Sequence, residues 1–124
     1  QTGIERLRDM PNIHYDLSAV ADVMPFVTLF QKEDHRRLFF GSDAIDSTAF
    51  HGGYVSLGRT WRGIKADELG TDLSHSTPKR PVLAIYQQLL ATKHAAEIAG
   101  LSRDQVEDIF WRNAASALGV DWPE

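Results

Sequence analysis

The sequence of 124 residues contains no cysteine. This absence excludes disulfide bonds, thiolate metal ligands and thiol nucleophiles together, and it fits a reducing compartment, so we expect a cytoplasmic protein. Long hydrophobic runs are missing too: no apolar stretch reaches the roughly 18 residues that a membrane-spanning helix needs, and the N-terminus lacks the layout of a signal peptide. We therefore expect no membrane partner.

Positive charge is in short supply. The 13 Lys and Arg residues are outnumbered by 17 Asp and Glu residues, which gives a formal net charge of −4. A nucleic-acid binder needs a basic face that neutralises phosphates, so we expect no nucleic-acid partner. What is present is the composition of an ordinary folded domain, because 43% of the residues are hydrophobic and 24% are charged.

The N-terminal third of the chain has the pattern of one βαβ unit. Residues 12–18 alternate between polar and apolar side chains, which predicts a strand with one buried face. Residues 22–33 carry apolar side chains at helical spacing, which predicts an amphipathic helix. The short apolar run at residues 38–40 predicts a second, buried strand.

The remaining two thirds of the chain predict a loop and two helices. Residues 44–80 hold five of the nine glycines and show no sustained period, which predicts a long loop excursion. A long helix is expected between Pro81 and Gly100, and a final helix from a Ser102/Gln105 capping box to Gly119. The expected buried stripes are Val82, Ile85, Tyr86, Leu89 and Ala96 on the first helix and Val106, Ile109, Phe110, Ala117 and Leu118 on the second.

One polar residue interrupts the stripe of the final helix. Asn113 lies between Phe110 and Ala117 on the apolar face. A buried amide must find hydrogen-bond partners. We therefore expect Asn113 to hold a neighbouring segment in place rather than to take part in catalysis.

Asp43 is the position at which the sequence predicts chemistry. It follows the second expected strand and Gly41-Ser42, where a parallel strand delivers its carboxyl end to a ligand cleft. The strand alternation would point Asp43 inward. The alternative is that Asp43 caps a loop or a helix, as most Asp residues after Gly-Ser do.

The five histidines carry only a weak metal signal, because no two share the i, i+2 or i, i+4 spacing at which one strand or helix holds an ion. His14 and Asp16 lie on the polar face of the first strand, which either lines a site or faces solvent. We expect His94 on the surface of a helix, and His51 and His75 to be ordinary loop residues.

Three segments together resemble the last third of the amidohydrolase-related family of metal-dependent hydrolases and decarboxylases. They are NIHYDLS at residues 12–18, RLFFGSD at residues 37–43, and VEDIFWRNAA at residues 106–115 followed by Leu118-Gly119. The order and approximate spacing agree with the family over most of residues 10–44 and 98–120.

The resemblance implies a fold and a site. The chain would be a helix-rich α/β piece, the C-terminal fragment of a (β/α)8 TIM barrel with its last two strands plus helices. Residues 1–124 would form a single partial domain, with the excursion at residues 44–80 on the rim of the active site. Asp43 would be the family's eighth-strand aspartate, which binds the catalytic divalent metal, Zn²⁺ by the family's chemistry, and moves the proton of the attacking water.

The resemblance leaves other parts of the site outside the chain. The family's histidine ligands lie upstream of anything present, and no substrate-binding residue is identified. A closed barrel takes roughly 250 residues, and position 1 is Gln rather than Met. We therefore expect a piece of a longer protein.

The implied function is hydrolysis of an amide, lactone or related bond in a small-molecule substrate, or a decarboxylation. The chain alone is expected to be inactive and to self-associate, because two strands taken from a barrel expose hydrogen-bonding edges on both sides. An alternative of a different class is a small non-catalytic α/β binding or interaction module in which Asp43 only caps a loop.

Overall fold

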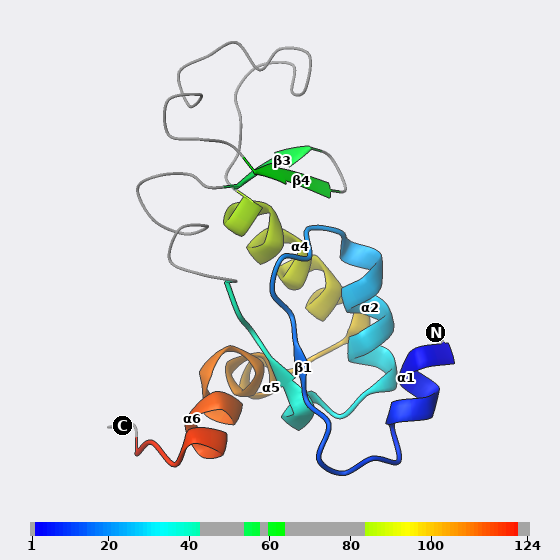
Figure 1. Ribbon diagram of the computed structural model, residues 1–124, viewed down its shortest axis with the longest axis vertical. Coiled ribbons are helices and arrows are strands. Elements are labelled where there is room, and N and C mark those ends of the chain that lie inside the picture. The colour runs from blue at the N-terminus through cyan, green and yellow to red at the C-terminus, as the bar shows by residue number, and fades with distance from the viewer. Residues whose placement is uncertain (1, 43–53, 58–59, 64–83, 122–124) are drawn as a thin grey trace.

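The computed structural model describes residues 2–42, 54–57, 60–63 and 84–121. These residues form a mixed α/β, helix-rich structure (Figure 1). The elements in chain order are α1 (Thr2–Leu7), β1 (Tyr15–Asp16), α2 (Val23–Lys32), the 3₁₀ turn η1 (His35–Arg37), β2 (Leu38–Phe39), β3 (Tyr54–Leu57), β4 (Thr60–Gly63), α4 (Ala84–Ala99), α5 (Arg103–Glu107), the π turn η3 (Asp108–Arg112) and α6 (Asn113–Leu118).

The predicted βαβ unit is confirmed. Strands β1 and β2 pair in parallel, with Tyr15 opposite Leu38, and α2 connects them. The paired strands are shorter than expected, but solvent exposure alternates along residues 12–17 as the sequence pattern predicts. Helix α2 begins where expected, because the Asp22 carboxylate accepts a hydrogen bond from the backbone N–H of Met24.

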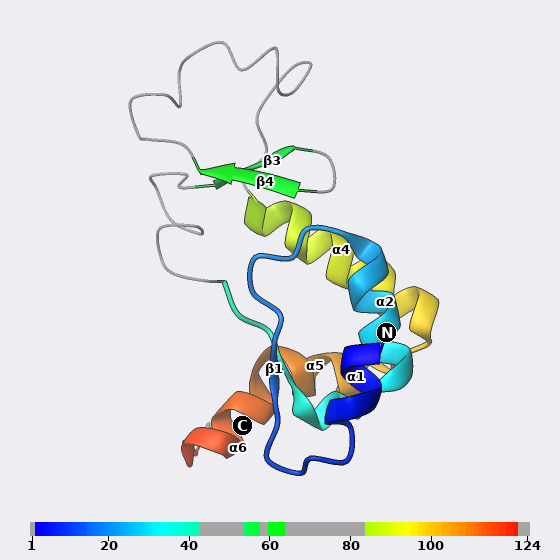
Figure 2. The same ribbon diagram turned by 45° about the vertical axis from the view of Figure 1, so that its right-hand side comes forward.

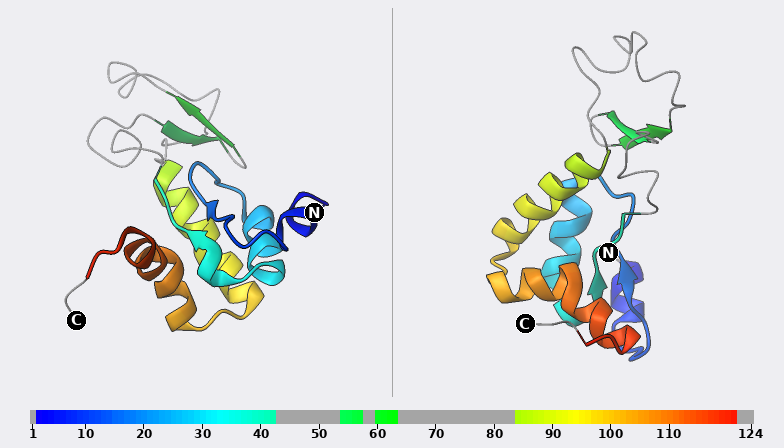
Figure 3. Two further views of the ribbon diagram at one scale, coloured as in Figure 1. Left: turned by 60° about the horizontal axis from the view of Figure 1, so that its bottom comes forward. Right: turned by 90° about the vertical axis from the view of Figure 1, so that its left-hand side faces the viewer.

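The core lies where α2 and α4 pack on the strand pair. In the two views of Figure 3, α2 runs alongside α4, and β2 lies between α2 and the C-terminal helices. The buried cluster consists of Leu17, Phe26, Val27, Phe30, Leu38, Ala91, Ala95, Ala96 and Ile109. Each of these helices therefore uses one apolar face to cover the short sheet.

Helix α4 buries Ala96 as expected, but the rest of its buried face differs from the expected stripe. Its buried side chains are Gln88, Ala91, Thr92, Ala95 and Ala96. Tyr86 and Leu89, which were expected in the core, are 61% and 37% exposed. Ile85 is only partly buried, and Val82 lies outside the described residues. The reason is that small side chains allow two helices to approach closely, whereas the prediction followed the larger apolar residues.

The final helix contains a π turn that the sequence did not reveal. The Ser102/Gln105 capping box is confirmed. In η3, however, the backbone N–H of Asn113 donates to the carbonyl of Asp108, five residues back. One extra residue per turn rotates the following helix by about 100°, so Ala117 and Leu118 are exposed rather than buried.

The expected loop excursion contains a hairpin. Strands β3 and β4 pair antiparallel, with Leu57 opposite Thr60, so the prediction of a structureless loop is wrong for these strands. The sequence between them is Gly58-Arg59, and a two-residue Gly-X connection is a common hairpin signal. The rest of residues 44–80 lies outside the described residues.

The outer edge of β2 is closed. Because Phe39 turns its backbone polar groups toward β1, its neighbours Leu38 and Phe40 turn theirs away. The Leu38 carbonyl accepts a hydrogen bond of 2.9 Å from the side-chain amide of Asn113, and the Phe40 N–H donates one of 2.9 Å to the carbonyl of Ile109. The expectation of two open edges is therefore wrong at β2.

The guanidinium of Arg37 attaches the C-terminal end of α1 to the βαβ unit. Arg37 donates hydrogen bonds to the carboxylate of Glu33 and to four backbone carbonyls, those of Leu7, Arg8, Met10 and Ile13. The side chain of Glu33 is only 1% exposed and that of Arg37 14% exposed. This bonding satisfies carbonyl groups at the C-terminal end of α1 that the helix itself leaves unpaired.

No helix within the described ranges is long and apolar enough to cross a membrane.

Candidate functional site

The expected site lies at the carboxyl ends of β1 and β2. Parallel pairing brings these two ends to the same edge of the sheet. The structure describes the chain through Ser42, so Asp43 lies outside the described residues. The described part of this edge consists of the residues that precede Asp43 and those that pack beside them.

Asp16, Ser18 and Gly41 meet at this edge. The Asp16 carboxylate accepts hydrogen bonds from the Ser18 N–H at 2.7 Å and from the Ser18 hydroxyl. Across the sheet, a Cβ atom built on Gly41 would come within 2.6 Å of Asp16 Oδ1 and would also collide with the Ser18 hydroxyl oxygen. A larger residue at position 41 would therefore displace the side chains of Asp16 and Ser18.

Gln88 ties the two strand ends together from α4. Its buried side-chain amide donates to the carbonyl of Leu17 at 3.1 Å and to the carbonyl of Gly41 at 2.8 Å. The sequence analysis missed Gln88, because it lies off the expected apolar stripe. The available signal was its spacing from the small residues at positions 91, 92 and 95, which share its helix face.

The polar face of β1 is exposed at His14 and Asp16. The ring of His14 stacks on Phe39, with centroids 4.9 Å apart. Neither side chain is enclosed, so of the two interpretations left open by the sequence, the described residues favour a face that contacts solvent. The Asp16 carboxylate and the Ser18 hydroxyl can accept or donate hydrogen bonds to a polar ligand.

A second polar cluster joins η1 to η3 at the opposite, amino end of β2. His35 Nε2 lies 3.1 Å from Asp108 Oδ2, and Asp108 Oδ1 accepts a hydrogen bond of 3.2 Å from Arg112. Asn113 is half-buried and donates to the carbonyls of His35 and Leu38. The prediction that Asn113 holds a neighbouring segment is confirmed.

The carboxyl group of Asp34 has a lowered pKa. A hydrogen bond from the Arg36 side chain, with Arg36 Nη2 2.6 Å from Asp34 Oδ2, lowers the pKa of Asp34 to about 2. Asp34 also accepts a hydrogen bond from the Arg36 backbone N–H and so caps η1. A perturbed pKa points to a functional site when the group lies in a cleft. The lowered pKa of Asp34 instead follows from its structural role as the cap of η1.

The remaining histidines add no metal site. His94 is exposed on α4 and lies 3.4 Å from Glu97, as expected for a surface residue. His51 and His75 lie outside the described residues. In the part of the chain that the structure describes, no three His, Asp or Glu side chains are grouped so that they could hold a metal ion.

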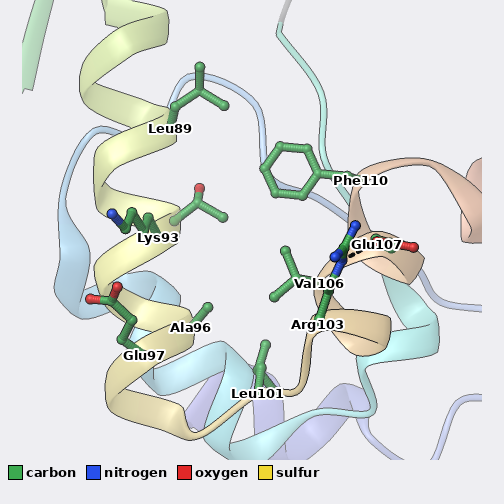
Figure 4. A pocket seen from close by; sticks show the side chains of 10 residues that line it. Leu89, Lys93, Ala96, Glu97, Leu101, Arg103, Val106, Glu107 and Phe110 are labelled. Carbon is green, nitrogen blue, oxygen red and sulfur yellow. Dashed lines mark hydrogen bonds and ion pairs between the residues drawn. The ribbon is translucent and has the colours of Figure 1, made fainter.

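A groove of about 450 Å³ lies between α4 and the C-terminal helices (Figure 4). Its lining includes the apolar residues Leu89, Ala96, Leu101, Val106 and Phe110 and the charged residues Lys93, Glu97, Arg103 and Glu107. Arg103 and Glu107 pair with each other at 2.8 Å. The groove thus offers apolar surface together with charged side chains. None of the residues described at the strand ends lines it.

The chain matches no protein-family model, no curated protein sequence and no solved structure.

Proposed function

We propose that the chain is the C-terminal part of a metal-dependent, amidohydrolase-type TIM-barrel enzyme that hydrolyses an amide, lactone or related bond of a small molecule, or decarboxylates one. The observation that supports this proposal is the parallel βαβ unit, whose two strands end at one edge. Asp43 follows β2 there by way of Gly41-Ser42. A cytoplasmic location is part of the proposal and rests on the absence of cysteine.

Asp43 is proposed as metal ligand and proton acceptor. A catalytic zinc ion lowers the pKa of its bound water to about 7, and an adjacent carboxylate can take the proton. The described residues do not make up a complete zinc site by themselves, and one carboxylate cannot replace the three protein ligands that a catalytic zinc needs. The proposal therefore requires further ligands from outside this chain.

The test is Asp43→Asn in the longer protein, assayed against a panel of amides and lactones with and without added zinc. We expect turnover to fall by at least ~10²-fold, the usual scale for loss of a proton-transfer group, while circular dichroism is unchanged. Ser42→Ala is the matched control, since it alters the neighbouring side chain without removing a carboxylate. Near-normal turnover in folded Asp43→Asn protein would remove Asp43 from the site.

The alternative is a small non-catalytic α/β binding module, and one observation favours it. In a closed barrel every strand has a strand on each side, whereas the outer edge of β2 is occupied by Asn113 and Ile109. Absence of any metal-dependent activity, together with an upstream coding sequence that lacks a His-x-His after a predicted strand, would support the module.

A further inference from the structure

Among the residues that the structure describes, none occupies the outer edge of β1. Tyr15 directs its backbone groups toward β2, so its neighbours His14 and Asp16 direct theirs outward. Both residues are exposed, and no described residue donates to or accepts from these outward backbone groups. Since the edge of β2 is closed by Asn113 and Ile109, the strand pair offers one edge to a partner.

We propose that this edge binds a second copy of the chain, with the two β1 strands antiparallel and Tyr15 on the two-fold axis. Two identical strand edges can pair about a two-fold axis, and each then covers the other. In this register the backbone groups of His14 face those of Asp16 of the second copy. By symmetry, Asp16 faces His14 of the second copy. Both are hydrogen-bonded pairs, in which each residue exchanges an N–H and a C=O bond with its partner.

The side chains select the same register. His14 and Asp16 flank Tyr15, so reversal of the strand sets each imidazole opposite a carboxylate across the two-fold axis. An imidazole N–H donates well to a carboxylate, and cross-strand pairs of this kind stabilise a sheet. A shift by two residues would instead set Asp16 opposite Asp16 of the second copy, which like-charge repulsion disfavours.

The neighbouring contacts prepare both side chains for this pairing. Stacking on Phe39 limits the positions that the His14 ring can take. Asp16 accepts hydrogen bonds from Ser18 through Oδ1, and a carboxylate has about four acceptor positions in all. The carboxylate can therefore keep its bonds to Ser18 and accept another. This inference concerns the given chain by itself, since in a closed barrel the same edge of β1 would pair with a neighbouring strand.

The first experiment measures association of the chain by sedimentation velocity between about 5 µM and 0.5 mM. We expect a reversible monomer–dimer equilibrium. His14→Pro removes the outward N–H without touching the bonds to β2, because proline is tolerated where an edge strand faces outward. We expect it to weaken the dimer at least ~10-fold relative to His14→Ala, which keeps the N–H. A monomeric wild-type chain, or a His14→Pro variant that dimerises as well as His14→Ala, overturns the proposal.

The second experiment fixes the register even if the proline variant does not fold. Because the chain has no cysteine, His14→Cys and Asp16→Cys chains each carry one thiol. Facing residues of a hydrogen-bonded pair have Cα atoms about 5.5 Å apart, within disulfide range. An equimolar mixture of the two chains is then mildly oxidised. Random pairing would make half of all disulfide-linked dimers heterodimers, and we expect the dimer linked between positions 14 and 16 to exceed this half. Ser116→Cys, exposed on α6, measures collisional cross-linking, and a random distribution of products overturns the register.

Discussion

The side-chain amide of Asn113 donates a hydrogen bond of 2.9 Å to the carbonyl oxygen of Leu38, 75 residues earlier in the chain. The same nitrogen donates to the carbonyl of His35 at 2.8 Å. One side chain thus closes the edge of β2 and attaches the C-terminal helices to the βαβ unit, as Figure 2 shows for the placement of α6 beside the strands.

Replacement of Asn113 by Leu should destabilise the chain by about 2–3 kcal/mol. The Leu38 carbonyl loses its donor in a partly buried place, and the His35 carbonyl keeps only its bond from the Leu38 N–H. Urea unfolding followed by circular dichroism measures the change. Ser116→Ala, an exposed position on the same helix, should stay within about 0.5 kcal/mol of the wild type. Equal stabilities for the two variants would contradict the role assigned to Asn113.

Gln88→Met should cost about 1–3 kcal/mol, since methionine fills a similar volume but leaves the carbonyls of Leu17 and Gly41 without their donor. Hydrogen exchange gives a local readout. The Leu17 N–H, which bonds to the Phe39 carbonyl at 2.9 Å, should exchange faster in this variant. The control is Thr92→Val, because the Thr92 hydroxyl bonds only within α4, to the Gln88 carbonyl. It should leave the exchange of Leu17 unchanged, and acceleration in both variants would argue against a specific strand-end contact.

Arg37→Met should be more damaging than Arg37→Lys. Methionine removes the cation that is hydrogen-bonded to the buried carboxylate of Glu33 and leaves it with Arg8, whose Nε lies 4.0 Å from Oε1. Breaking a buried pair typically costs about 3–5 kcal/mol, and we expect a loss near the lower end of this range. Lysine keeps the charge but has three donors on one nitrogen instead of five on a planar fork. The expected order of unfolding free energy is wild type, then Arg37→Lys, then Arg37→Met. Adding Glu33→Gln to Arg37→Met should recover part of the loss, and failure to recover any would mean that the charge of Glu33 is not the cause.

The contribution of Asp34 should depend on pH. Its pKa is lowered to about 2 in the folded chain by the hydrogen bond from Arg36, below the value near 3.9 of an unfolded chain. A lowered folded pKa stabilises the fold above pH 4, and this stabilisation is lost as the pH falls from about 4 to about 2. Asp34→Asn should therefore be less stable at pH 7 by no more than about 1 kcal/mol, because the pair is exposed to water.

Urea titrations at pH 7, 5 and 3 test this dependence. The difference between Asp34→Asn and the wild type should be the same at pH 7 and 5 and smaller at pH 3. Arg36→Gln should show the same pH profile, since it removes the other half of the pair. A difference that grows on acidification would reverse the assigned sign.

The βαβ unit was predictable because its signals are local. Alternation along residues 12–18 and the helical spacing of residues 22–33 each depend on neighbours in sequence, and the structure bears out both. Asn113 was predictable for the same reason, since a lone amide on an apolar stripe needs a partner wherever the helix packs.

The buried face of α4 and the turn at η3 were not predictable from pattern alone. Close approach of two helices favoured alanine and threonine over Tyr86 and Leu89, and that preference depends on the partner helix rather than on the sequence of α4. The π turn shifts the phase of α6 without any proline or glycine to mark it. Gln88 was missed together with the face on which it lies. The role predicted for Asp43, which lies outside the described residues, stays a prediction.

The long span bridged by Asn113 has a consequence for the order of folding. Strands β1 and β2 join residues separated only by α2, whereas the contacts of His35 with Asp108 and of Leu38 with Asn113 span 73 and 75 residues. Closing a longer loop costs more chain entropy, and contacts distant in sequence slow folding. We therefore expect the βαβ unit to form early and the C-terminal helices to dock after it, so that substitutions at Asn113 mainly accelerate unfolding and leave the folding rate nearly unchanged.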